Sequence, residues 1–297
     1  LEWLLPPDQL QEAQQATPNA FYTPPGVAAA CWRILRGLGF DRGRVLEPRC
    51  GAGAFMAAAL ADAEITWTGV ERDPVTARIA RLLHPSAQVI NQRIESAALP
   101  AHSVDAVIGN VPFGDVAVYD PTAPKAVAKS LHNYCIWRSV RTLRPGGVAV
   151  LITSRYTMDS RDAGPRRAIA DEADLIGAIR LPGDALASGG TEVVTDIVVL
   201  RRRDGDDPSD DADWIETIPL DEAIPGHQWQ YDDRINQWFV THPAAVLGEL
   251  RPDHAAQYGR TVRVGRPADI DPLDDALADA TRALVADAEA QLSLIHI

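Results

Sequence analysis

Four consecutive residues, Asn110-Val111-Pro112-Phe113, combine groups that suit the activation of an aromatic amine. Such an amine is a weak nucleophile because its lone pair is delocalised into the ring. The side-chain carbonyl of Asn110 can accept one amino hydrogen. The main-chain carbonyl of Val111 can accept the other, held extended because Pro112 disfavours helix in the residue before it. Phe113 offers a ring for base stacking. The alternative reading is an ordinary turn after a strand, to which Asn and Pro are also suited.

A second motif, LEPRCGAGAF at 46–55, has the composition of a cofactor loop. Gly51 and Gly53 allow close approach of a ligand to the backbone, and the following helix offers free N–H groups at its start. Glu71 follows about 20 residues later, where an acid can bind ribose hydroxyls. That spacing also fits a nicotinamide dinucleotide. Glu47 before the glycines and Phe55 after them favour S-adenosylmethionine, whose amino acid end is cationic.

The elements that must position these motifs alternate between β-rich and helical runs. The β-rich runs lie at 45–48, 65–70, 87–90, 104–110, 147–153, 175–181 and 193–200. The helical runs lie at about 54–63, 74–83, 125–143 and 164–173. This order predicts a doubly wound α/β sheet whose ligand crevice lies at the carboxyl ends of the strands. The last two β-rich runs have little helix between them, so we expect an antiparallel pair at the sheet edge.

Composition and charge divide the chain into regions. We expect an N-terminal extension at 1–16, a catalytic domain at 17–203 and an acidic linker with a partial C-terminal region at 204–297. The net charge of −13 is concentrated in this last region, because residues 1–203 hold 22 Lys and Arg against 21 Asp and Glu. The stretch 138–203 holds 11 arginines against 8 acids and is either a phosphate-binding surface or a solvated face. A polar helix is predicted at 271–292. The first residue, Leu1, and the C-terminal sequence predict an incomplete chain.

Composition disfavours a membrane-spanning protein and a metal-binding one. No apolar run is long enough to span a bilayer. The cysteines, Cys31, Cys50 and Cys135, are scattered without metal-ligand spacing, so we predict no metal site and a cytoplasmic location.

The order of these motifs resembles the gamma-type DNA methyltransferases that act on the N(6) amino group of adenine. FYTPPGVAAACWRIL (21–35) is similar to the N-terminal motif of that family, VLEPRCGAGAF (45–55) to its glycine loop and GVERDP (69–74) to its ribose-binding motif. The resemblance implies a class I methyltransferase fold, S-adenosylmethionine as cofactor, DNA as partner and Asn110 to Phe113 as the catalytic tetrad. The cofactor-binding positions that it implies are Tyr22, Thr23, Pro24, Glu47, Pro48, Gly51, Gly53, Phe55, Glu71, Arg72 and Glu95.

The sequence departs from that family at one catalytic position. The tetrad of the family is usually Asn or Asp, Pro, Pro and an aromatic residue, whereas Val111 stands here for the first proline. That position acts through its carbonyl, so the change does not by itself abolish activity, but it puts the rigidity of the loop in question.

The resemblance is most specific for the methylase part of methylase–helicase proteins of phages and mobile elements. It rests on GNVPFG (109–114), on residues 130–159 and on the two edge runs, and it extends over about 17–203. It implies a helicase domain in the full-length protein.

Two rival functions remain open. Enzymes with the same type of tetrad also methylate the amino groups of RNA bases and of protein glutamine. The second alternative is an inactive, protective DNA-binding module of a larger mobile-element protein.

Overall fold

The computed structural model describes residues 23–59, 64–114, 116–186, 193–205, 214–230, 232–253, 261–266 and 273–295. A single seven-stranded sheet runs through its centre in the order β3-β2-β1-β4-β5-β7-β6. Its strands are β1 (Arg42–Glu47), β2 (Glu64–Val70), β3 (Gln88–Ile90), β4 (Val104–Asn110), β5 (Leu143–Ser154), β6 (Ala173–Arg180) and β7 (Thr195–Arg202). The predicted doubly wound α/β sheet is confirmed.

One strand of this sheet is reversed. The strands β1 to β5 are parallel to one another, whereas β7 is antiparallel to both β5 and β6. The expected antiparallel pair at the edge is therefore present. Because β7 is inserted between β5 and β6, the edge strand is β6, the earlier of the two in the chain.

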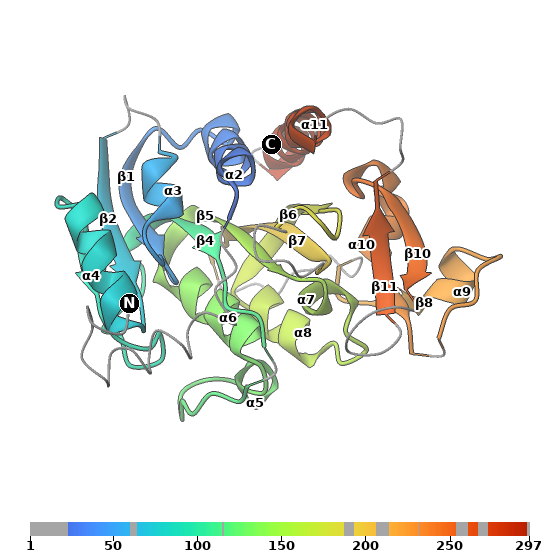
Figure 1. Ribbon diagram of the computed structural model, residues 1–297, viewed down its shortest axis with the longest axis horizontal. Coiled ribbons are helices and arrows are strands. Elements are labelled where there is room, and N and C mark those ends of the chain that lie inside the picture. The colour runs from blue at the N-terminus through green and yellow to red at the C-terminus, as the bar shows by residue number, and fades with distance from the viewer. Residues whose placement is uncertain are drawn as a thin grey trace, which may run out of the picture.

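Helices cover both faces of the sheet (Figure 1). The upper face carries α2 (Pro25–Gly37) and α11 (Leu273–Ile295), and the lower face carries α6 (Leu131–Thr142) and α8 (Gly164–Ala170). Around the sheet lie the shorter helices α3 (Ala54–Ala57), α5 (Lys125–Ala128) and α7 (Tyr156–Asp159), and the longer α4 (Pro74–Leu83). Buried apolar side chains form two clusters, one on each face.

The predicted helix at 125–143 is two helices in the structure. It breaks at Ser130, which is extended (φ −137°, ψ 138°) and precedes α6. The N–H of Leu131 donates to the carbonyl of Gly114 at 3.2 Å, so the break joins α6 to the loop after Phe113. Serine suits this position because it is favoured at helix starts over helix interiors. Of the helix predicted at 54–63, α3 forms Ala54–Ala57, and 60–63 lie outside the described residues.

Described residues beyond 213 pack on the same two clusters. They form two small antiparallel pairs, two short helices, a 3₁₀ turn and α11: β8 (Thr217–Pro219), α9 (Leu220–Ala223), β9 (Arg234–Asn236), α10 (Gln237–Thr241), η3 (Pro243–Ala245), β10 (Glu249–Asp253) and β11 (Thr261–Gly265). Trp214, Phe239 and Val264 belong to the lower cluster, and Leu277 and Leu284 to the upper one. Arg201 and Arg202 extend β7 beyond the β-rich run predicted at 193–200.

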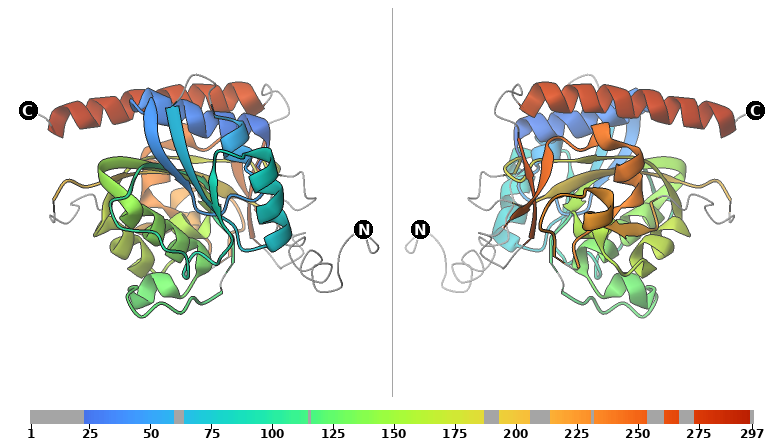
Figure 2. Two further views of the ribbon diagram at one scale, coloured as in Figure 1. Left: turned by 90° about the vertical axis from the view of Figure 1, so that its left-hand side faces the viewer. Right: turned by 90° about the vertical axis from the view of Figure 1, so that its right-hand side faces the viewer.

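Helix α11 lies along α2 over the top of the sheet (Figure 2). Three glycines permit α11 to pack closely, two on α2 and one on β6. A β-carbon at Gly37 would lie 2.6 Å from Val285, and one at Gly177 would lie 2.6 Å from Leu284. A β-carbon at Gly26, in the first turn of α2, would collide with the Asp274 carboxylate. The polar helix predicted at 271–292 is confirmed as α11, which packs closely against α2.

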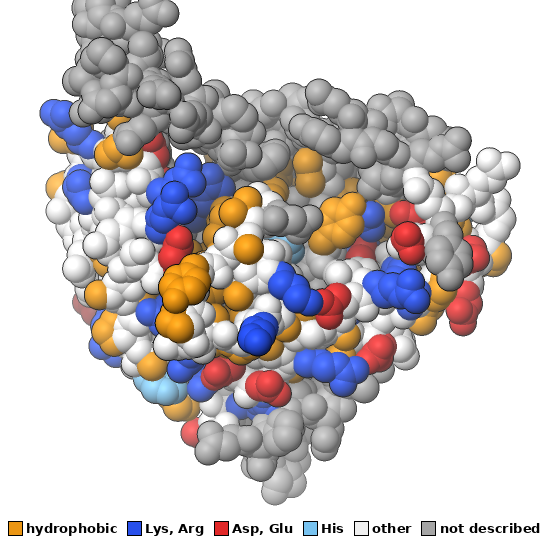
Figure 3. Space-filling model, turned by 90° about the horizontal axis from the view of Figure 1, so that it is seen from below, with side chains coloured by type: hydrophobic (Ala, Val, Ile, Leu, Met, Phe, Trp, Pro, Cys, Tyr) orange, Lys and Arg blue, Asp and Glu red, His pale blue; other side chains and the backbone are white. Residues whose placement is uncertain are grey.

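The arginines of 138–203 are mostly engaged within the protein. Arg166 is buried and donates to the carbonyls of Ile215 (2.8 Å), Thr157 (3.3 Å) and Ser160 (2.8 Å). Ion pairs with acidic side chains engage Arg141, Arg144, Arg155, Arg161, Arg167, Arg180, Arg202 and Arg203. On the underside of the molecule, Lys and Arg side chains are interspersed with acids and apolar groups (Figure 3). The stretch is therefore mainly structural.

Arg180 is the centre of a buried ionic network. It is fully buried, makes two bonds to the Asp196 carboxylate (2.8 and 2.9 Å) and pairs with Asp159 at 2.8 Å. Its guanidinium lies 4.2 Å from the ring centre of Phe239. Asp159 also accepts the N–H of Asn236 at 2.9 Å. The network therefore joins the edge of the sheet to the region after residue 213.

Among the described residues, every helix is too short or too polar to cross a membrane.

Replacement of Arg180 by Ala should destabilise the protein by about 3–5 kcal/mol, because the buried Asp196 carboxylate loses its cation and Asp159 keeps only its longer pair with Arg155, at 3.4 Å. Replacement of Lys129 by Ala is the control. Its pair with Asp162 is 3.0 Å long but both side chains are largely exposed, so a loss of about 0–1 kcal/mol is expected. Denaturant unfolding followed by Trp fluorescence measures both. Equal losses in the two variants would contradict the assigned role of the network.

Candidate active site

The catalytic motif lies at the carboxyl end of β4, a central strand. Asn110 is the last residue of β4 and is 9% exposed. The N–H of Val111 donates to the carbonyl of Ile152 at 3.0 Å, which extends the pairing of β4 with β5 by one residue. A proline could not make this bond. Val111 therefore fixes the start of the loop through a backbone hydrogen bond instead of a ring.

Asn110 is also tied to the N-terminal motif. Its Nδ2 donates to the hydroxyl of Thr23 at 3.2 Å, across 87 positions of sequence. Thr23 is 9% exposed and precedes α2, whose N-cap is Pro24. Thr23, in the N-terminal motif, and Asn110, in the tetrad, therefore meet at one wall of the site.

The glycine loop follows β1 and owes its shape to two left-handed residues. Gly51 has φ +53° and Gly53 has φ +91°, conformations that side-chain-bearing residues rarely adopt. A β-carbon at Gly53 would also collide with the ring of His84. The Glu71 carboxylate accepts the N–H of Gly51 at 3.0 Å and that of Asp73 at 2.8 Å. Glu71 thus holds the loop, and its oxygens keep further lone pairs for a ligand.

Glu47, at the end of β1, is 1% exposed. Burial raises the pKa of this carboxyl well above its ordinary value, against the opposing effect of the Phe55 and Met56 N–H groups, and nearby Glu71 raises it further. Among the described residues, no hydrogen-bond partner contacts its Oε2. A buried acid in this state is suited to receive a cation.

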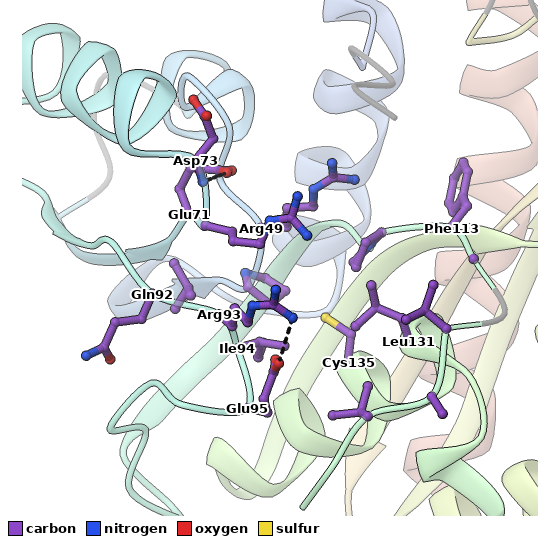
Figure 4. A pocket seen from close by; sticks show the side chains of 18 residues that line it. Arg49, Glu71, Asp73, Gln92, Arg93, Ile94, Glu95, Phe113, Leu131 and Cys135 are labelled. Atoms are coloured by element: carbon purple, nitrogen blue, oxygen red, sulfur yellow. Dashed lines mark hydrogen bonds and ion pairs between the residues drawn. The ribbon is translucent and has the colours of Figure 1, made fainter. Parts of the chain in front are cut away.

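Two cavities lie on either side of Arg49 and together form the site. The first, of about 420 Å³, lies between the glycine loop, Thr23 and Asn110. The second, of about 290 Å³, lies between Glu71, the residues after β3 and the loop that contains Phe113. Both are lined by Arg49, Glu71 and Asp73, so they lie next to each other. Figure 4 shows Arg49 and Glu71 on one side of the second cavity and Phe113, Leu131 and Cys135 on the other.

The structure brings most of the sequence-predicted residues to these two cavities. The larger is lined by Thr23, Glu47, Gly51, Gly53, Phe55, Glu71 and Asn110. The smaller is lined by Pro48, Glu71, Arg72, Glu95, Pro112 and Phe113. Three predicted residues differ. Val111 is 1% exposed and its side chain is in the core, Pro24 caps α2 outside both linings, and Tyr22 lies outside the described residues.

Phe55 contributes to the site mainly through its backbone. Its side chain is 1% exposed and packs in the upper core, and its carbonyl accepts the indole N–H of Trp32 at 2.8 Å. Glu95 lines the smaller cavity and pairs with Arg93 at 3.7 Å.

Sequence reasoning missed several lining residues. Arg49 lies in the glycine loop, but no chemistry was assigned to it, although burial lowers the pKa of its guanidinium. Leu131 and Cys135 are four residues apart on α6 and so share a face, but only the tertiary fold turns that face toward the cavity. Within the described part of the chain, no cluster of three metal-binding side chains occurs.

The sheet order, the reversed β7 and the site at the carboxyl ends of the central strands define the class: the chain has the fold of class I S-adenosylmethionine-dependent methyltransferases. A protein from Listeria monocytogenes described as a member of that class matches with a TM-score of 0.51 and 18% identity, over 64% of this chain and 63% of that one. The M protein of the type I restriction enzyme EcoKI matches with a TM-score of 0.52 and 18% identity, over 93% of this chain and 72% of that one.

A curated relative adds sequence similarity. The chain is 32% identical over 209 residues to the "Defense against restriction protein B" of Escherichia phage P1, which covers 68% of this chain. The chain spans 9% of the length of that relative. No family model matches the chain.

Replacement of Glu47 by Gln should stabilise the unliganded protein increasingly as pH rises. The folded-state pKa of Glu47 is raised. The glutamate therefore stabilises the fold fully only below its unfolded pKa of about 4.3, and this contribution is lost as pH rises toward the folded pKa. Thermal unfolding of both proteins between acid and neutral pH measures the difference, and a pH-independent difference would contradict the prediction.

Proposed function

We propose that this chain transfers the methyl group of S-adenosylmethionine to the exocyclic N(6) amino group of adenine in DNA. The observation that carries the proposal is the meeting of Asn110 with Glu47 and the glycine loop in one cavity. An amine-orienting amide and an acid suited to a cationic donor then lie at the same edge of the sheet.

The residues present fit the donor. S-adenosylmethionine has a cationic amino acid end, a ribose and an adenine ring, and when bound it supplies an electrophilic methyl group. Glu47 offers a buried carboxylate oxygen to the ammonium group, and Glu71 offers further lone pairs to the ribose hydroxyls. The smaller cavity, lined by Ile94, Pro112 and other apolar groups, suits the adenine ring. Arg72 and Glu95 lie at this end.

The acceptor residues orient an amine without forming a covalent bond to it. The Asn110 carbonyl oxygen and the Val111 main-chain carbonyl accept the two amino hydrogens, so the nitrogen lone pair is directed toward the donor. Phe113 stacks the extruded base. Rate enhancement then comes from positioning and preorganised hydrogen bonding.

Two observations favour DNA over RNA or protein as acceptor. The tetrad and the flanking motifs resemble adenine-specific DNA methyltransferases, and the relative from phage P1 is named for defence against restriction. A helicase domain in a longer protein, and a role in protecting mobile-element DNA, belong to the same proposal. The inactive module is the second candidate function, and Val111 is the residue that favours it. The Val111–Ile152 hydrogen bond weakens that case because it keeps the motif anchored.

Replacement of Asn110 by Ala should lower methyl transfer by at least about 100-fold, since one essential hydrogen-bond acceptor is lost. Asn110→Asp is the matched control and should retain part of the activity, because a carboxylate still accepts the amino hydrogen. Transfer of labelled methyl from S-adenosylmethionine to DNA, RNA and protein acceptors measures activity. Calorimetry should show unchanged donor binding in both variants.

Three outcomes contradict the proposal in different ways. Full activity of Asn110→Ala removes the assigned catalytic role. Preferred transfer to RNA or protein changes the acceptor. A wild-type chain that binds no donor supports the inactive module.

A further inference from the structure

The loop after Phe113 carries two exposed apolar side chains, one that lines the smaller cavity and one that directly follows residues lining it. Val116 is 63% exposed and Tyr119 is 89% exposed. Between them, Ala117 and Val118 line the cavity. One segment therefore forms part of the cavity wall and, at the next residue, presents an aromatic ring to solvent.

The residues on both sides of Tyr119 are anchored. The N–H of Val118 donates to the carbonyl of Ala128 at 2.8 Å. The Asp120 carboxylate accepts the hydroxyl of Tyr134 at 2.7 Å and the N–H of Thr122 at 2.8 Å. Tyr119 is thus held outward by a fixed backbone. An aromatic ring fixed in solvent offers a large contact surface at low cost in conformational entropy.

Cations flank this loop. Lys125 begins α5 and is exposed, and within the described part of the chain no ion pair engages it. Lys129 follows one turn later and pairs with Asp162 at 3.0 Å. Over this underside, Lys and Arg side chains lie among apolar and acidic ones (Figure 3). A stacking ring beside cations matches the chemistry of a nucleic-acid strand, which offers base faces and phosphates together.

We infer that Tyr119, supported by Val116, stacks on a base of the DNA strand that enters the site, with Lys125 contacting a phosphate. This inference rests on the proposed function. Extrusion of the target base breaks its stacking on both neighbours, and an aromatic ring beside the cavity compensates for part of that loss. Phe113 holds the target base, whereas Tyr119 holds a neighbouring one.

The test is DNA affinity of the full chain, measured by fluorescence anisotropy with a labelled adenine-containing duplex and the corresponding single strand. Tyr119→Ala should weaken binding about 5- to 150-fold, the equivalent of about 1–3 kcal/mol of base stacking, and Tyr119→Phe should bind like the wild type. Leu82→Ala is the control, since Leu82 is 74% exposed on α4 and lines neither cavity. It should bind like the wild type.

Salt dependence separates the two contacts. Tyr119→Ala should keep the slope of log affinity against log salt, whereas Lys125→Ala should reduce that slope by about one. Donor binding by calorimetry should be unchanged in both variants, which shows that the fold and the donor site are intact.

Each other outcome overturns the inference. If Tyr119→Ala binds DNA as tightly as Leu82→Ala does, the inferred stacking contact is wrong, and the proposed function is unaffected. If the wild-type chain binds RNA of the same sequence more tightly than DNA, the strand that Tyr119 contacts is RNA and the inference is wrong. A wild-type chain that binds donor but neither form of DNA rejects the DNA part of the proposed function as well.

Discussion

The position of β4 between β1 and β5 is the constraint on which the rest of the site depends. Parallel pairing of β4 with both neighbours brings the carboxyl ends of three strands to one edge, so segments about 60 residues apart meet there. This arrangement places Glu47 and Asn110, and the parallel pairing of β2 with β1 places Glu71 at the same edge. The hydrogen bond from Asn110 to Thr23 then fixes the start of α2 against the same edge.

The fold maintains an unfavourable group at this edge and offsets its cost elsewhere. Glu47 is buried with a raised pKa. Two apolar clusters and the Arg180 network stabilise the surrounding sheet. Helix α11 adds to this by packing on α2 through Gly26 and Gly37. The acidic region after residue 213 is therefore part of the support of the donor site, because α2 begins next to Thr23.

Local chemistry made much of the fold predictable. Helix α4 begins and ends where its sequence predicts, because Pro74 starts it and the Asp73 side chain accepts the N–H of Thr76 at 2.7 Å. The central strands follow from their β-branched runs. Sequence could not place β7 between β5 and β6, since that choice depends on long-range pairing. The tetrad and the glycine loop could be predicted from the sequence because each is a short local motif. Leu131 and Cys135 could not, because they reach the cavity only through tertiary packing.

The central claim is that Asn110 and its cavity methylate adenine in DNA. Modification-sensitive long-read sequencing of DNA from a methylation-free host that expresses this chain tests it most directly. The account predicts N(6)-methyladenine in a recurring sequence context, which would also identify the target site. Unmodified adenine throughout, from a chain that is folded and binds S-adenosylmethionine, would contradict it.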